Sequence, residues 1–368
     1  MVKRLMQFVV IVLSISSLVA CVAAPAASTG SSQSGSTSNT VTNTVGTKAS
    51  GGSLTLTLGA YSTPRDAYAK IIPLFQAQWK AKTGQDVKFE ESYLGSGAQS
   101  RAIVQGFEAD IAALSLEADI TNIAKAKLIT HDWKSGPQKG MVSDSVVAFA
   151  VRKGNPKGIK DWADLAKPGL EILTPNPKTS GGAMWNILAL YGAAKQGLIN
   201  GVPKDDDAAA QKFLLAVLNN VTALDKDARS SITNFEQGVG DIAITYENEV
   251  KVAQKSGKDD ELVIPAATIL IENPVAVVDV YVDKHGTRAA AEAFVNFLYT
   301  KEAQQIFADY GLRSIDPDVA KATAAQYPKV ANLFDITYFG GWDKATPQFF
   351  GPDGIYTKTV AQVQKLSQ

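Results

Sequence analysis

The chain has 368 residues, of which 45% are hydrophobic and 20% charged, and its formal net charge is zero. This ordinary globular composition leaves room for two domains, and the balanced charge gives no indication of nucleic-acid binding. A single cysteine excludes an intramolecular disulfide, and the two histidines, His131 and His285, lie far apart without metal-type or triad-type neighbours.

The N-terminal region is typical of an exported protein. Lys3 and Arg4 precede an apolar run, and we expect residues 1–20 to be a signal peptide. The run ends in Leu18-Val19-Ala20-Cys21, which resembles a bacterial lipobox with Cys21 as the lipidated residue; a plain signal peptide with a chance cysteine is the alternative. Residues 21–52 are rich in Ala, Ser, Thr and Gly, and we expect them to form a disordered tether after the lipid.

Strands and helices alternate after the tether. The alternating run 53–61 predicts a strand, and Thr63, Pro64 and Asp66 predict the start of a helix with Thr63 as its N-cap. Further strands are expected at 86–91, 109–114, 143–152, 170–173, 240–247 and within 261–283. Further helices are expected at 161–166, 183–195, 204–219, 287–310 and near 358–366, and two more are expected to begin after Gly95-Ser96 and after the turn 225–231. The β-α-β-α-β order at the start indicates an open α/β sheet, which binds ligands at the carboxyl ends of its strands.

The stretch from Thr174 to Asn186 predicts an anion site. Its prolines end a buried strand, Ser180 offers a hydroxyl cap, and Gly181-Gly182 leaves backbone N–H groups bare where a helix begins. The first N–H groups of a helix have no partner within the helix and carry partial positive charge. An ordinary strand-to-helix turn remains the alternative for this stretch. Gly95-Ser96-Gly97 forms a second turn of the same kind.

Signals for catalysis are weak. Gly238-Val239-Gly240 precedes a strand, whereas a dinucleotide-binding turn follows one, and the sequence contains no phosphate-binding loop, nucleophile elbow or zinc spacing. Ser96 and Ser180 have no evident histidine partner. We therefore expect neither a cofactor nor a metal. Arg65 and Arg229 stand beside the turns, where they could order the site, attract anions or lie solvated on the surface.

From about Leu54 to about Lys344 the chain resembles the periplasmic sulfate- and thiosulfate-binding proteins of ABC importers. The matching motifs are Gly95-Ser96-Gly97, Val151-Arg152-Lys153-Gly154-Asn155-Pro156, Thr174-Pro175-Asn176-Pro177-Lys178, Ser180-Gly181-Gly182, Glu247-Asn248-Glu249 and Phe339-Gly340-Gly341-Trp342. The resemblance implies a two-lobed type II binding-protein fold joined by a hinge. We expect lobe 1 to comprise 53–145 and 268–368, and lobe 2 to comprise 146–267.

The resemblance also implies the ligand contacts. In that family a dehydrated dianion lies between the lobes, held by neutral donors. By position, the donors here are Ser62, Ser96, Ser180, Gly181, Gly182, Ala228 and Tyr246. Tyr246 stands where the family usually has a tryptophan whose indole N–H reaches the anion; a phenol can donate or accept.

The expected function is that of the solute-binding component of a sulfate or thiosulfate importer. We expect a monomer, lipid-anchored to the bacterial membrane, that serves a permease and its ATPase and is not an enzyme. One alternative is a binder of another tetrahedral oxyanion, such as phosphate, molybdate or chromate. The other is a lipid-anchored hydrolase that uses Ser180 as its nucleophile.

Overall fold

The computed structural model describes residues 52–363. The expected signal peptide, Cys21 and the tether up to residue 51 lie outside the described residues. Within 52–363 no helix is both long and apolar enough to span a membrane, and no group of three or more His, Cys, Asp and Glu side chains is placed to hold a metal ion.

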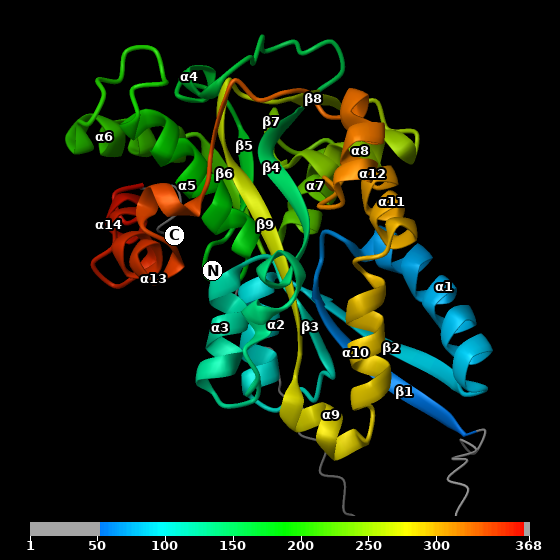
Figure 1. Cartoon of the computed structure of the whole chain (residues 1–368). Coiled ribbons are helices and arrows are strands. Elements are labelled where there is room, and N and C mark those ends of the chain that lie inside the picture. Colours follow the sequence, from blue (N-terminus) through cyan, green and yellow to red (C-terminus); the bar gives the residue numbers. More distant parts are fainter. Residues whose placement is uncertain (1–51, 364–368) are drawn as a thin grey trace, which may run out of the picture. The chain divides into compact units, whose positions relative to one another are not determined.

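A sheet of ten strands organises this part of the chain (Figure 1). Its strand order is β2-β1-β3-β9-β4-β7-β5-β6, with β10 paired to β9 and β8 paired to β4. The strands are β1 (Ser53–Tyr61), β2 (Asp86–Leu94), β3 (Ile111–Ala113), β4 (Met141–Val151), β5 (Ile172–Pro175), β6 (Val221–Asp225), β7 (Ile242–Tyr246), β8 (Glu261–Val263), β9 (Ala267–Val277) and β10 (Asn332–Phe334). The expected α/β class is confirmed.

Helices flank the sheet. They are α1 (Arg65–Thr83), α2 (Ser96–Val104), α3 (Glu117–Lys125), α4 (Trp162–Leu165), α5 (Gly181–Lys195), α6 (Asp207–Leu218), α7 (Ala228–Glu236), α8 (Glu247–Lys255), α9 (Asp279–His285), α10 (Arg288–Phe297), α11 (Lys301–Asp309), α12 (Pro317–Thr323), α13 (Trp342–Ala345) and α14 (Ile355–Val360).

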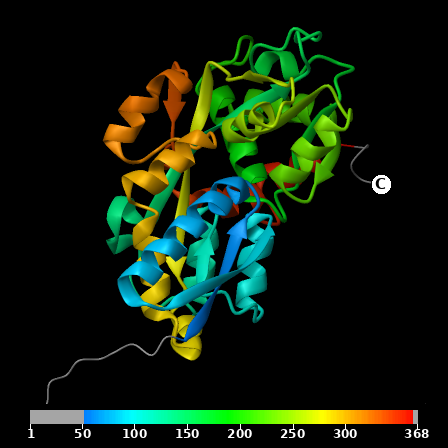
Figure 2. The ribbon, with the colours of Figure 1, turned by 90° about the vertical axis from the view of Figure 1, so that its right-hand side faces the viewer.

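Two long strands join the halves of the sheet. In β9, Val275–Val277 pairs with β3, and the preceding residues pair with the start of β4. The second part of β4, Val147–Val151, pairs with β7. Figures 1 and 2 show the blue and cyan elements on one side of this link and the green elements on the other. We call these the first half (β1–β3, α1–α3, α9–α11) and the second half (β5–β8, α4–α8).

Each half has its own apolar core. In the first half, Tyr68 and Phe75 of α1 pack on Phe294 of α10. In the second half, α5 is buried on every side from Gly181 to Ala194, because it is apolar all round. Helix α13 also packs on the core of the second half, where the ring centroids of Trp342 in α13 and Trp185 in α5 are 4.7 Å apart. The expected lobe boundaries stay a prediction.

Two local expectations were wrong. Thr63 does not cap α1, whose N-cap is Pro64 with no side-chain cap. The single helix expected over 287–310 is two helices, since Thr300 accepts a hydrogen bond from the Ala303 N–H and starts α11. The strands expected within 261–283 are present as β8 and β9, and helix α9 follows them.

Candidate functional site

Three helix starts meet where the first and second halves touch. They are those of α2, α5 and α7, which follow β2, β5 and β6. The N–H of Ala98 donates to the Thr179 carbonyl at 3.1 Å, and the Thr179 hydroxyl donates to the Lys226 carbonyl at 2.8 Å. A Cβ on Gly95 would lie 2.5 Å from the Thr179 oxygen and 2.9 Å from the Lys226 oxygen, so only glycine fits this junction.

The start of α5 agrees with the predicted anion turn. Ser180 is its N-cap, and the Ser180 hydroxyl accepts a hydrogen bond from the Ala183 N–H. A Cβ on Gly182 would lie 2.8 Å from Cε2 of Tyr246, 3.4 Å from the Ser180 Oγ and 3.6 Å from the Cβ of Ala228. Four predicted contacts therefore surround one point of the backbone.

A chain of hydroxyls links Tyr246 to the start of α2. Its phenol oxygen lies 2.8 Å from the Ser115 hydroxyl, and either atom can donate. The Ser115 N–H donates to the Ser96 Oγ at 2.9 Å, and the Ser96 hydroxyl donates to Oδ2 of Asp119 at 2.5 Å. The Ser115 hydroxyl would also lie 2.5 Å from a Cβ on Gly181. Six of the seven predicted contacts thus belong to one connected cluster, namely Ser96, Ser180, Gly181, Gly182, Ala228 and Tyr246.

Sequence reasoning missed Ser115 and Asp119. Ser115 touches three predicted residues, yet in the sequence it is one serine in an apolar run. Asp119 lies 23 positions after Ser96 and reaches it only because α2 packs against α3. No local sequence pattern indicates the contacts of Ser115 or of Asp119. The one available clue was that Ser115 places a hydroxyl shortly after the expected strand 109–114.

Ser62 is buried directly after the end of β1, and its carbonyl accepts a hydrogen bond from the Arg65 N–H. Its two neighbours connect it to the cluster. The ring of Tyr61 lies 6.3 Å from that of Tyr246, and the Thr63 carbonyl accepts a hydrogen bond from Arg229. The Tyr61 hydroxyl is buried and has no hydrogen-bond partner within residues 52–363, so it is a further donor of the same region.

Arg229 and Arg65, the two arginines expected beside the turns, both have partners. Arg229 donates to Glu249 and to Asp66, each at 2.7 Å, and to the Thr63 carbonyl at 3.2 Å. Since Asp66 and Thr63 lie in the first half and Arg229 in the second, these bonds tie the halves together. Arg65 lies over the Tyr93 ring. Burial raises the pKa of Tyr246, so its phenol stays neutral and can serve as an uncharged donor.

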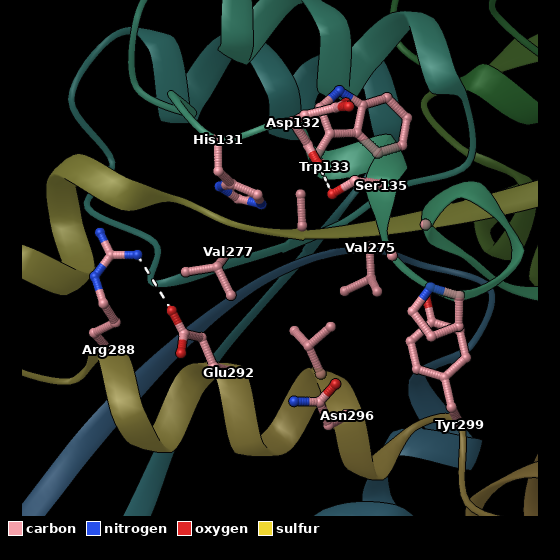
Figure 3. A pocket seen from close by; sticks show the side chains of 15 residues that line it. His131, Asp132, Trp133, Ser135, Val275, Val277, Arg288, Glu292, Asn296 and Tyr299 are labelled. Carbon is pink, nitrogen blue, oxygen red and sulfur yellow. Dashed lines mark hydrogen bonds and ion pairs between the residues drawn. The ribbon is translucent and has the colours of Figure 1, made fainter.

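The residues of the cluster are almost fully buried; Tyr246, for example, is 1% exposed. A surface pocket lies elsewhere, between the segment His131–Gly140, β9 and α10 (Figure 3). None of the predicted contacts lines it.

Comparison with known proteins identifies the family. Residues 56–313 match the profile of the bacterial extracellular solute-binding proteins. The chain is 47% identical to the sulfate-binding protein of Synechococcus elongatus, over 86% of this chain and 90% of that protein. It is 35% identical to the thiosulfate-binding protein of Pseudomonas aeruginosa, over 81% and 89%.

A solved structure agrees with this. The sulfate-binding protein SubI from Mycobacterium tuberculosis H37Rv superposes with a TM-score of 0.74 at 39% identity, covering 81% of this chain and 99% of that one. The fold is therefore the expected two-lobed, type II periplasmic-binding-protein fold, and the chain belongs to the bacterial extracellular solute-binding proteins.

Proposed function

We propose that this protein captures sulfate or thiosulfate for an ABC importer. The observation that carries the proposal is the convergence of three helix starts with the hydroxyls of Ser96, Ser180 and Tyr246 at one buried place. Sulfate is fully ionised at neutral pH and presents acceptors only, so it requires donors. Helix N-terminal N–H groups and hydroxyls supply them without a cation. Relatives named as sulfate- and thiosulfate-binding proteins support the same ligand class.

In this proposal Ser62, Ser96, Ser180, Gly181, Gly182, Ala228 and Tyr246 contact the anion. The lobes close around it, and the bonds of Arg229 to Asp66 and to the Thr63 carbonyl hold the closed arrangement. The closed form then docks on the permease. Export, a lipid anchor at Cys21 and a monomeric state are parts of the same proposal.

The proposed role is binding without turnover. The ring of His131 contacts Asp279, and the ring of His285 contacts Asp110, so both histidines are engaged in the first half, away from Ser180. A serine nucleophile needs a base within hydrogen-bond reach. The side chain that does reach a candidate serine is Asp119, which accepts from Ser96.

Calorimetry of the folded domain against sulfate, thiosulfate, phosphate, molybdate and chromate tests the proposal. We expect stoichiometric binding of sulfate or thiosulfate and no consumption of the ligand. Binding of phosphate or molybdate in preference to both sulfur oxyanions would move the assignment to another tetrahedral oxyanion. Failure of every oxyanion to bind would remove the proposal.

A further inference from the structure

Two buried hydroxyls face each other across the two halves of the protein. Ser115 follows β3 in the first half, and Tyr246 ends β7 in the second half. Both residues are 1% exposed, and their hydroxyl oxygens are 2.8 Å apart. This contact is therefore a side-chain hydrogen bond between the halves, and either residue can be its donor.

The pair has one proton more than its internal hydrogen bond uses. Each hydroxyl brings one proton and can accept as well as donate. One proton lies between the two oxygens, so the other remains whichever residue donates. Neither hydroxyl has a second hydrogen-bond partner within residues 52–363. A buried O–H without an acceptor is costly, so the remaining proton needs a partner that a bound ligand can supply.

The remaining proton lies beside the first N–H groups of α5. A Cβ on Gly181 would lie 2.5 Å from Oγ of Ser115, and a Cβ on Gly182 would lie 2.8 Å from Cε2 of Tyr246. The two hydroxyl residues thus pack on the two glycines that begin α5. The N–H groups of that first turn have no partner within the helix and favour an anion. An anion bound there would be an acceptor for the remaining proton.

The backbone of Ser115 is held on both sides. Its N–H donates to Oγ of Ser96 at 2.9 Å, and its carbonyl accepts the indole N–H of Trp185 at 3.0 Å. Asn273 of β9 is a more distant donor to the same carbonyl, at 3.5 Å. Because Trp185 belongs to α5 and β9 joins the halves, Ser115 is fixed relative to both. A fixed hydroxyl loses little freedom when it bonds to Tyr246, so it is a preorganised partner.

The donor strengths of the two hydroxyls decide which proton faces the anion. The phenol is the more acidic hydroxyl, and a dianion is a stronger acceptor than either oxygen. The most favourable order therefore runs from the Ser115 hydroxyl to the Tyr246 oxygen, and from the Tyr246 hydroxyl to the anion. Hydrogen bonds in such a chain strengthen one another. Burial raises the pKa of Tyr246, and the hydrogen bond of Ser115 opposes that rise because it stabilises negative charge on the phenol oxygen.

We propose that Ser115 is a positioning residue of the anion site, whose hydroxyl donates to Tyr246 and thereby turns the Tyr246 proton toward the bound oxyanion. The inference rests on the proposed function and adds to it a residue that is not among the predicted contacts. Each proton stays on its own oxygen, so binding requires no proton transfer. Since the pair joins the two halves, this donor is complete only when the halves are in contact.

A double-mutant cycle on Ser115 and Tyr246, measured by sulfate calorimetry, tests the proposal. Tyr246→Phe removes the proton that faces the anion and should weaken sulfate binding by at least about tenfold, as expected for a hydrogen bond to a charged group. Ser115→Ala should weaken it by about two- to tenfold, since the phenol can still donate but is neither oriented nor polarised. The double variant should bind within about twofold of Tyr246→Phe, because Ser115 acts only through Tyr246.

Nuclear magnetic resonance of protein labelled at the tyrosine Cζ atoms observes the phenol directly. Of the signals of the eleven tyrosines, the one that Tyr246→Phe removes belongs to Tyr246. Sulfate should move this signal toward the position of an ionised phenol in the wild type, because the O–H bond weakens when it donates to the anion. The movement should be smaller in Ser115→Ala. A signal that sulfate leaves in place in the wild type would contradict the proposed direction of the Tyr246 proton.

Ser100→Ala is the matched control. Ser100 of α2 is 2% exposed, and its hydroxyl also makes a hydrogen bond of 2.8 Å, but to the Asp119 carbonyl and to none of the predicted ligand residues. It should bind sulfate like the wild type. A Ser115→Ala variant that binds like the wild type, or that loses the same factor with and without the Tyr246 hydroxyl, would overturn the inference while leaving the proposed function intact. A wild type that binds neither sulfate nor thiosulfate would overturn both.

Discussion

Replacing Arg229 with methionine should destabilise the protein mainly through Glu249. The Glu249 side chain is fully buried and its carboxylate is 2.7 Å from Nε of Arg229, whereas the side chain of Asp66, the second partner of Arg229, is 37% exposed. Removing one partner of a buried ion pair costs about 3–5 kcal/mol, because the other charge stays buried without compensation. The exposed contact with Asp66 contributes at most about 1 kcal/mol. The Glu249 contact therefore dominates the loss.

Urea unfolding followed by tryptophan fluorescence measures this cost. Arg229→Met should lower the free energy of unfolding by about 3–5 kcal/mol, and Asp66→Asn by about 1 kcal/mol or less. The double variant Arg229→Met with Glu249→Gln should regain most of the loss, since no buried charge remains. A loss below about 1 kcal/mol for Arg229→Met, or a double variant no more stable than the single one, would refute the reasoning.

The pH dependence of the same variant provides a second check. Burial raises the pKa of Glu249, and Arg229 opposes this rise. Without Arg229 the folded-state pKa moves further above its unfolded value. The folded state then binds the proton more tightly, so the stability of Arg229→Met should fall as pH rises between the two values and recover in acid. An equal loss at acidic and neutral pH would contradict the assignment to Glu249.

Three further variants address the ligand site and the anchor. Gly182→Ala puts a Cβ 2.8 Å from the Tyr246 ring and should weaken sulfate binding at least tenfold in calorimetry, while Gly136→Ala, where a Cβ meets nothing within 4 Å, should bind normally. Tyr246→Phe removes a hydroxyl and should cost about 1.5–3 kcal/mol of sulfate binding free energy; equal affinity would show that Ser115 holds that hydroxyl away from the anion. Cys21→Ser should abolish incorporation of labelled fatty acid and release the protein from membranes; retention of unlipidated protein would refute the anchor.

Features encoded within a few residues could be predicted from the sequence. Alternation identified β1, and a hydroxyl followed by two glycines identified the start of α5 with Ser180 as its cap. Thr63 carries the same local cap signal, yet its hydroxyl does not cap α1. Its hydroxyl is buried where Arg229 joins the two halves, and Pro64 takes the N-cap position.

The site could be predicted only in outline. Glycines and hydroxyls at strand ends indicated an anion turn, because the backbone N–H groups and hydroxyls that would bind an anion lie within a few residues of one another in the sequence. The direction of the Ser96 proton depends on Asp119, and the direction of the Tyr246 hydroxyl depends on Ser115, which is 131 positions away. Such pairings arise when helices and strands distant in sequence pack together. No local pattern in the sequence encodes them.

The packing of the later chain on α5 has a consequence for how the protein is made. Trp342 lies against Trp185, Phe349 lies against Tyr191, and β10 pairs with β9. The core of the second half therefore stays incomplete until residues near 350 have left the ribosome, although most of its strands were synthesised more than one hundred positions earlier. Contacts of such high sequence separation form slowly. The growing chain should remain a partly folded substrate for export factors and chaperones until almost all of it has been translated.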